Sequence, residues 1–322
     1  MEFTVQITIF LVSFLLIIYG GDKFVDAALS IGRKLGISTM ILGATIVSLT
    51  TTLPELFVSS FASVSGHVDM AIGNAIGSII CNTGLILGLC AFLSPMKLSG
   101  HPQTKKVILL ITAVLAIFIM SFFGPIKWYE GLLLYVLLGI FITINLQEAK
   151  EGGNEQQESD YTGKTLVIFA LSAVAIVIGS RLLVNSASAL ATMLHVPEKI
   201  IALSLVALGT SLPELVTSLT AIRKHEAGLS IGNIIGANIL NVVLVMSTSS
   251  LLAKGGLTSS VATEGILKGL NQLKVLDIPV ALVMALILYF CTRRKEVSRT
   301  TGILLFAIYA GYLIFLFFAT AL

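Results

Sequence analysis

Ten apolar stretches, each about as long as a membrane-spanning helix, account for most of this chain of 322 residues. A helix needs about 20 predominantly apolar residues to cross the hydrocarbon core of a bilayer. The stretches cover residues 4–30, 38–65, 69–95, 104–123, 127–147, 164–192, 199–223, 228–252, 274–292 and 300–320. Only 11% of the residues are charged, whereas a soluble domain has about 25%. The sequence therefore predicts an all-α integral membrane protein with ten transmembrane helices.

The longest polar stretch lies in the middle of the chain and separates two groups of five helices. It reads QEAKEGGNEQQESDYTGK from Gln147 to Lys164, a composition typical of a solvated linker. We expect a first five-helix unit over residues 1–146, a linker over 147–163 and a second five-helix unit over 164–322. The linker contains no Ca²⁺-binding loop of the EF-hand type, so we expect no regulatory domain there.

The distribution of positive charge predicts the orientation of the bundle. Of the 20 Lys and Arg residues, 13 lie in the loops after helices 1, 3, 5, 7 and 9, and five lie in the loops on the opposite side. Cytoplasmic loops carry the excess of positive charge. We therefore expect a multi-pass protein of the cell (plasma or inner) membrane, with a cytoplasmic linker and both termini extracellular or periplasmic. The N-terminus lacks the basic region of a signal peptide, so we expect it to form the first spanning helix.

The second half of the chain repeats the first at a constant offset of 159 residues. The two copies of the repeated motif occupy residues 43–83 and 202–242, and the offset pairs Glu55 with Glu214 and Asn82 with Asn241. Because five is an odd number, the second unit must enter the bilayer from the opposite face, which makes an inverted repeat. A duplication kept only for packing would explain the small residues, but not two polar, proline-broken segments at matched positions.

Each copy places a proline in the middle of a spanning segment. Pro54 and Pro213 have no N–H, so the carbonyls of Thr50 and Gly209 lose their usual helical partner. Broken backbone at membrane depth is tolerated only against protein or a water-filled cavity. The sequence therefore predicts two Pro-broken core helices whose free carbonyls face the interior.

A glutamate follows each of these prolines. An acid at the bilayer centre is unfavourable by at least about 2.5–3.5 kcal/mol, which makes Glu55 and Glu214 functional candidates. The structural alternative is a glutamate paired with a buried base. It has little support, because Lys23 and Arg181 are the basic residues within the predicted helices, and both lie nearer the helix ends.

The side chains around the two breaks are rich in oxygen and include no convergent His or Cys. They are Ser48, Thr50, Thr51, Thr52, Glu55, Ser78, Asn82 and Thr83 in the first copy, and Thr210, Ser211, Glu214, Asn238 and Asn241 in the second. Such a set suits a hard cation such as Na⁺ or Ca²⁺, and a cation would relieve the repulsion between two buried carboxylates. For Asn74 and Asn233 we expect structural hydrogen bonds rather than cation contact. The sequence predicts a midplane cation site between the repeats.

These motifs resemble those of the cation/Ca²⁺ exchanger superfamily. TTTLPE…GNAIGSIICN and GTSLPE…GNIIGANILN correspond to its two alpha repeats, and the resemblance covers both halves of the chain. The compact prokaryotic Na⁺/Ca²⁺ exchanger branch is the most similar. The resemblance implies that helices 2, 3, 7 and 8 form a core and that helices 1 and 6 slide across it.

The resemblance also implies a set of ligands. The Ca²⁺ site would combine two carboxylates with two backbone carbonyls, from Glu55, Glu214, Thr51 and Thr210. One flanking Na⁺ site would combine a backbone carbonyl with three hydroxyls, from Ser48, Thr51, Thr52 and Ser78. The other would use the carbonyl of Ala207 with Thr210 and Ser211. Two amides, those of Asn82 and Asn241, would face the central position.

Three positions depart from the pattern of that family. Thr50 stands where the family usually has Gly, and it either stiffens the hinge or adds a ligand. Ala237 matches Ser78 of the first copy, so one Na⁺ site lacks a hydroxyl. Asn241 stands where K⁺-dependent and some archaeal relatives have Asp, which disfavours K⁺ co-transport. The hydroxyls in both copies favour Na⁺ over H⁺ as the coupling ion.

The sequence thus predicts a secondary active antiporter that exchanges Na⁺ for Ca²⁺ by alternating access. Its expected partners are these two ions and the lipid bilayer, with no cofactor, no nucleic acid and no obligatory protein partner. Exchange of Ca²⁺ or another cation for H⁺ remains an alternative, and a cation channel is a weaker one. An enzyme is not expected, because no Ser/His pair, His-rich metal motif or Asp dyad lies at a suitable depth.

Overall fold

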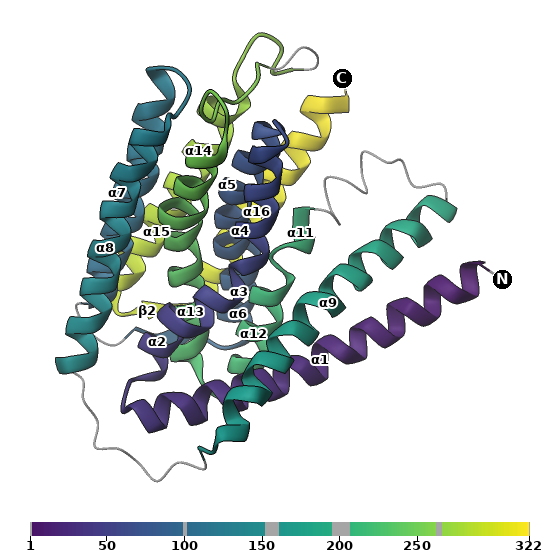
Figure 1. Ribbon diagram of the computed structural model, residues 1–322, viewed down its shortest axis with the longest axis vertical. Coiled ribbons are helices and arrows are strands. Elements are labelled where there is room, and N and C mark those ends of the chain that lie inside the picture. The colour runs from purple at the N-terminus through teal and green to yellow at the C-terminus, as the bar shows by residue number, and fades with distance from the viewer. Residues whose placement is uncertain (1, 99–101, 152–160, 195–206, 262–265, 322) are drawn as a thin grey trace.

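The computed structural model describes residues 2–98, 102–151, 161–194, 207–261 and 266–321, and these are helical apart from turns, loops and two short strands (Figure 1). Eight of the described helices are long and apolar enough to cross a membrane, and one broken pair would make a ninth. The count therefore does not confirm the expected ten spans. The expected seventh span, 199–223, lies partly outside the described residues.

Six of the eight candidate spans are single elements or nearly so. Their bounds are α1 (Glu2–Leu35), α7 (Pro102–Phe122), α8 (Trp128–Glu151), α9 (Gly163–Met193), η5 (Leu273–Asp277) with α15 (Ile278–Arg294), and α16 (Arg299–Ala321). Helix α8 runs past the expected start of the linker at residue 147, because Gln, Glu, Ala and Lys are all good helix formers.

The first broken segment is the bent pair. It consists of α2 (Thr39–Leu42), the π-helical η1 (Gly43–Val47) and α3 (Ser48–Thr51), followed after a bend of 41° by α4 (Leu53–Val64). Pro54 lies in the first turn of α4, where the missing N–H has no helical partner to lose. In the second copy, α11 (Ala207–Gly209) precedes α12 (Leu212–Arg223), and Pro213 again lies in the first turn.

The repeat is present in the local structure with the same offset. Helix α5 (Val68–Cys81) matches α13 (Ala227–Leu240), and each continues into a π-helical segment, η2 (Asn82–Leu87) and η4 (Asn241–Met246). These lead into α6 (Gly88–Leu93) and α14 (Ser247–Leu252). Both bounds of every pair, and those of α4 and α12, are 159 residues apart. The two halves therefore break their helices at the same places.

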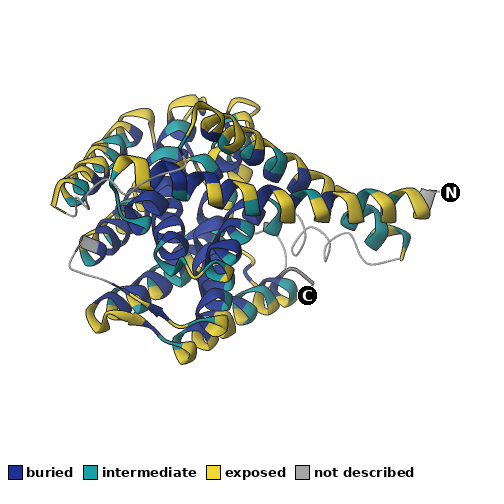
Figure 2. Ribbon diagram, turned by 90° about the horizontal axis from the view of Figure 1, so that it is seen from below, coloured by how far each residue is buried: buried dark blue, intermediate teal, exposed yellow. Residues whose placement is uncertain are grey.

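Helices α1 and α9 lie side by side and cross the rest of the bundle obliquely, with the N-terminal end of α1 projecting from it (Figures 1 and 2). Glycines allow the close approach, because a Cβ built at Gly179 would lie 2.8 Å from Ile17. Ion pairs join α1 to the end of α12. Asp22 lies 2.6 Å from Arg223 and 2.9 Å from Lys224, which also lies 2.7 Å from Asp26.

The surface of the protein carries many large apolar side chains, whereas its interior contains both apolar and polar side chains. Buried residues gather in the middle of the bundle (Figure 2), while large side chains such as Phe123 (85% exposed) and Phe61 (71% exposed) cover the outside. Apolar exposure on this scale would be unfavourable in water. The described helices therefore suit a membrane protein with several spans.

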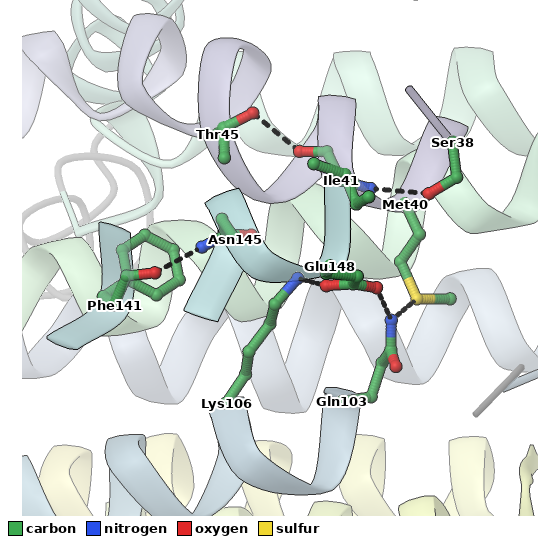
Figure 3. Close-up of polar contacts among 9 residues, drawn as sticks. All are labelled: Ser38, Met40, Ile41, Thr45, Gln103, Lys106, Phe141, Asn145 and Glu148. Carbon is green, nitrogen blue, oxygen red and sulfur yellow. Dashed lines mark hydrogen bonds and ion pairs between the residues drawn. The ribbon is translucent and has the colours of Figure 1, made fainter. Parts of the chain in front are cut away.

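A buried polar cluster joins α7, α8 and α2 at one end of the bundle (Figure 3). Lys106 forms an ion pair with Glu148 at 2.6 Å and is 1% exposed. Gln103 donates to Glu148 at 3.1 Å and also contacts the sulfur of Met40.

An antiparallel pair of short strands, β1 (Met96–Lys97) and β2 (Glu296–Val297), links the two halves of the chain.

Candidate functional site

Glu55 and Glu214 occupy the same place in the two broken segments, each in the first turn of the helix that follows the break. Both side chains are fully buried, and their charges are close enough to repel each other. Within the part of the chain that the structure describes, neither carboxylate accepts a hydrogen bond or forms an ion pair. Lys23 and Arg181 are exposed, so a described buried base does not account for these acids.

Two buried asparagines, Asn82 and Asn241, also have side-chain polar atoms without a described partner. Neither the amide nitrogen nor the amide oxygen of Asn82 and Asn241 has a partner among the described residues, although both side chains are fully buried. Each asparagine begins a π-helical segment, and π-helical turns are frequent at functional sites. Buried polar groups without partners are rare in native proteins, and a bound ion is one explanation for them.

The elements that carry these four residues cross between the two copies. Helix α12, which carries Glu214 in its first turn, packs against η2, where Asn82 is the first residue. Helix α4, which carries Glu55 in its first turn, packs against η4, where Asn241 is the first residue. In each copy, the helix that carries the glutamate therefore contacts the π-helical segment that begins with an asparagine in the other copy.

Thr51 and Thr52 complete the first break. Both are buried, and their hydroxyls lie beside the carboxylate of Glu214. The hydroxyl of Thr51 donates to the side-chain oxygen of Asn233 at 3.1 Å and lies 3.3 Å from the carbonyl of Ser48. These contacts bring hydroxyl, carbonyl and carboxylate oxygens together from both copies.

Further hydroxyls join the two copies nearby. Ser211, in the turn of the second break, donates to Ser78 of α5 at 3.4 Å, and both are buried. Asn238 of α13 donates to Thr83 of η2 at 2.8 Å. Of the remaining predicted site residues, Ser48 is fully buried, Thr210 is half-buried, and Ala207 begins α11.

Glycines bring α13 into backbone contact with the first broken segment. A Cβ built at Gly236 would lie 2.5 Å from the hydroxyl of Ser48, and one built at Gly232 would overlap the carbonyl of Met40. The matched Gly73 and Gly77 of α5 meet no described atom within 4 Å. The segment related to Met40–Ser48 by the repeat, 199–207, lies almost entirely outside the described residues.

A cavity of about 270 Å³ reaches both breaks from the side of α9. Both prolines line it, as do several polar residues: Ser180, Arg181, Asn185 and Thr210. The cavity borders the breaks rather than enclosing the glutamates. The broken segments therefore face a hollow on one side and packed protein on the other, as broken backbone at membrane depth requires.

Sequence reasoning missed two features of this region. The π-helical segments at Asn82 and Asn241 carry no distinctive apolar pattern, and only the matched asparagines could have pointed to them. Thr217 is fully buried, and its hydroxyl has no partner among the described residues. Its position three residues after Glu214 places both on one face of α12, a spacing that could have identified it.

The chain matches a known protein family over most of its length. The family described as sodium/calcium exchanger protein matches residues 5–147 and 164–318. A Methanosarcina acetivorans protein, the sodium/calcium exchanger MaX1, is 30% identical over 360 residues, which cover 98% of this chain and 99% of that protein. The membrane protein MJ0091 of Methanocaldococcus jannaschii is 33% identical, over 93% of this chain and 94% of that one.

Solved structures agree with the sequence comparisons. A structure of the sodium-calcium exchanger NCX_Mj, soaked with Na⁺ and Sr²⁺, superposes with a TM-score of 0.82 and 31% identity, over 97% of this chain and 99% of that one. The described helices, the family match and these relatives all point to a membrane transport protein. This chain therefore belongs to the prokaryotic Na⁺/Ca²⁺ exchanger branch of the cation/Ca²⁺ exchanger superfamily.

Proposed function

We propose that this chain is a secondary active antiporter that exchanges Na⁺ for Ca²⁺ across the cell membrane, with Ca²⁺ bound between Glu55 and Glu214. One observation carries the proposal. Two fully buried carboxylates lie close enough to repel each other and have no described partner. A divalent cation between them would balance both charges. The names of the relatives MaX1 and NCX_Mj support Na⁺ and Ca²⁺ as the exchanged ions.

The residues around the glutamates fit a hard cation. Ca²⁺ takes 6–8 oxygen ligands, and the two carboxylates can be joined by backbone carbonyls of Thr51 and Thr210. The amides of Asn82 and Asn241 are buried and have no described partner, which suits groups that face the central position. The proposed Na⁺ ligands are Ser48, Thr51, Thr52, Ser78, Ala207, Thr210 and Ser211.

The proposed architecture is ten transmembrane helices in two inverted five-helix units, over 1–146 and 164–322. The equal offset of the matched helices supports a structural repeat, and an odd number of helices in each unit would invert the second. The proposed topology has a cytoplasmic linker and both termini outside. Labelling of single cysteines introduced at Glu151 and Lys254 by a membrane-impermeant reagent should modify only position 254 in intact cells.

Charge balance supplies the coupling rule. Two ionised glutamates cancel one Ca²⁺, whereas three Na⁺ would leave an excess of one positive charge. Each charge that crosses the membrane contributes about 2.3 kcal/mol per 100 mV, so exchange of three Na⁺ for one Ca²⁺ would be electrogenic. An empty site would hold two bare carboxylates and should resist the change between inward-facing and outward-facing states. The change between the two states then requires that either Ca²⁺ or Na⁺ is bound.

The test is transport by the purified protein in proteoliposomes. An outward Na⁺ gradient should drive uptake of ⁴⁵Ca²⁺, and the uptake should saturate with external Ca²⁺. Uptake driven by a pH gradient without Na⁺ would overturn the proposal in favour of H⁺ coupling. Flux that does not saturate, or single-channel currents, would overturn it in favour of a channel.

A further inference from the structure

We propose that Asn233 is a positioning residue, which holds the hydroxyl of Thr51 so that its lone pairs face a transported Na⁺. The inference deepens the proposed function and rests on it for the identity of the ion. Asn233 lies on α13, in the opposite copy from Thr51, and is separated from it by 182 residues in sequence. It does not itself need to touch the ion.

A hydrogen-bond chain fixes both side chains. The hydroxyl of Thr51 donates to Oδ1 of Asn233 at 3.1 Å, and Nδ2 of Asn233 donates to the hydroxyl of Ser218 at 3.2 Å. Asn233 and Ser218 are fully buried, and Thr51 is 3% exposed. The donation to Ser218 directs the amide oxygen of Asn233 toward Thr51, because an amide has its donor and its acceptor on opposite sides.

The chemistry of a hydroxyl makes this orientation important. A threonine hydroxyl has one hydrogen and two lone pairs, and a cation is attracted by the lone pairs and repelled by the hydrogen. A hydroxyl that gives its hydrogen to Asn233 presents lone pairs alone to the opposite side. Thr51 is thereby set as a cation ligand before any ion arrives, which lowers the reorganisation that binding would otherwise require.

Asn233 also affects the neighbouring carbonyl. Two other acceptors lie near the Thr51 hydroxyl, the carbonyl of Ser48 at 3.3 Å and the carboxylate of Glu214. Both are proposed ion ligands, so a hydrogen from Thr51 would compete with the ion for either of them. By taking the hydrogen, Asn233 leaves both lone pairs of the Ser48 carbonyl free to face Na⁺.

The packing of α13 makes the contact rigid. Gly236 places α13 so close to the first break that a Cβ there would lie 2.5 Å from the hydroxyl of Ser48.

The matched asparagine of the first copy, Asn74, has different partners. It donates to Ser59 at 2.9 Å, as Asn233 does to Ser218, but its amide also donates to the backbone carbonyl of Glu55 at 3.2 Å. In the described structure it is Asn233 that accepts from a site hydroxyl.

The experiment compares Asn233→Leu with Asn233→Asp. Leu removes the acceptor, whereas Asp keeps an oxygen in its place. We would measure the midpoints of the Na⁺-dependent and Ca²⁺-dependent rises in thermal unfolding temperature of the purified protein, and the Na⁺ dependence of ⁴⁵Ca²⁺ exchange in proteoliposomes. Asn145→Leu is the matched control, since it removes a buried amide that donates to the backbone of its own helix α8.

Asn233→Leu should raise the Na⁺ midpoint by about 3- to 10-fold, the equivalent of one hydrogen bond, and should change the Ca²⁺ midpoint by less than about two-fold. Asn233→Asp should not raise the Na⁺ midpoint, and Asn145→Leu should leave both midpoints unchanged. Adding Asn233→Leu to Thr51→Val should cause no further rise, because the oriented hydroxyl is already gone.

Two results would overturn the inference. One is an unchanged Na⁺ midpoint in Asn233→Leu, and the other is an equal rise for Na⁺ and Ca²⁺, which would indicate general damage to the fold. The unfolding measurement does not depend on transport. If the wild-type protein showed no Na⁺-driven uptake, the proposed function would be wrong, and the Na⁺ titration of stability would still decide whether Asn233 orients Thr51.

Discussion

Asn74 and Asn233 make the same hydrogen bond in the two halves of the protein, each donating its side-chain amide to a serine 15 residues earlier, Ser59 at 2.9 Å and Ser218 at 3.2 Å. The bond ties α5 to α4 and α13 to α12. It therefore holds each glutamate-bearing helix against the following helix of its own copy. The expectation of structural hydrogen bonds for these two asparagines agrees with this arrangement.

The first prediction concerns the two carboxylates. Ca²⁺ at about 100 times its dissociation constant should stabilise the wild-type protein by about 2.7 kcal/mol. Glu55→Gln and Glu214→Gln should each abolish this stabilisation and Na⁺-driven ⁴⁵Ca²⁺ uptake, because each removes half of the charge that balances the ion. Without ions, both variants should unfold at a higher temperature than the wild type, since an uncompensated buried charge is unfavourable.

The control for this prediction is Glu296→Gln, which changes an exposed acid on β2 and should leave the response to Ca²⁺ intact. Full exchange in either site variant would contradict the assignment of the Ca²⁺ ligands.

The second prediction concerns the hydroxyl that the second copy lacks. Ala237 is fully buried and matches Ser78 of the first copy. Ala237→Ser should lower the Na⁺ concentration for half-maximal exchange by about two- to ten-fold, as expected for one added polar ligand, and should raise the Hill coefficient for Na⁺. Ala75→Ser, which adds a hydroxyl at a buried position of α5, should do neither. An unchanged Hill coefficient in Ala237→Ser would argue against a Na⁺ site there.

The third prediction concerns K⁺. Asn241 is a neutral amide, so the described residues of the proposed site include no third carboxylate whose charge a K⁺ ion could balance. With the membrane voltage clamped, replacement of K⁺ by choline on both sides should leave the rate of Na⁺-driven ⁴⁵Ca²⁺ uptake unchanged. Stimulation by K⁺ would show that another group supplies the missing charge, and Asn241→Asp would then be expected to strengthen the effect.

The fourth prediction concerns the cluster at the end of α7 and α8 (Figure 3). Glu148→Gln should destabilise the protein by about 3–5 kcal/mol, because it leaves Lys106 charged and buried without its partner. The double variant Lys106→Met, Glu148→Gln should recover most of the lost stability. Thermal unfolding of the single and double variants measures this coupling, and strictly additive effects would show that the pair contributes nothing as a pair.

Several features of the fold follow from the sequence for local reasons. Proline lacks an N–H, so Pro54 and Pro213 mark the breaks wherever the chain is placed, and the structure describes a new helix beginning one residue before each. The π-helical turns at Asn82 and Asn241 do not follow in this way. Their i+5 hydrogen bonds give up regular helical geometry, and the apolar pattern around them is that of an ordinary helix.

The sequence alone determined that this is a membrane protein with two matched breaks, each followed by an acid. Hydropathy, the chemistry of proline and a constant offset are properties of the chain itself, and they hold before any packing. The tertiary structure decided which groups meet. The contact of Thr51 with Asn233, and of each glutamate helix with the asparagine segment of the other copy, joins residues far apart in sequence. Such contacts depend on how closely the glycines of α13 let the helices approach, which no local pattern specifies.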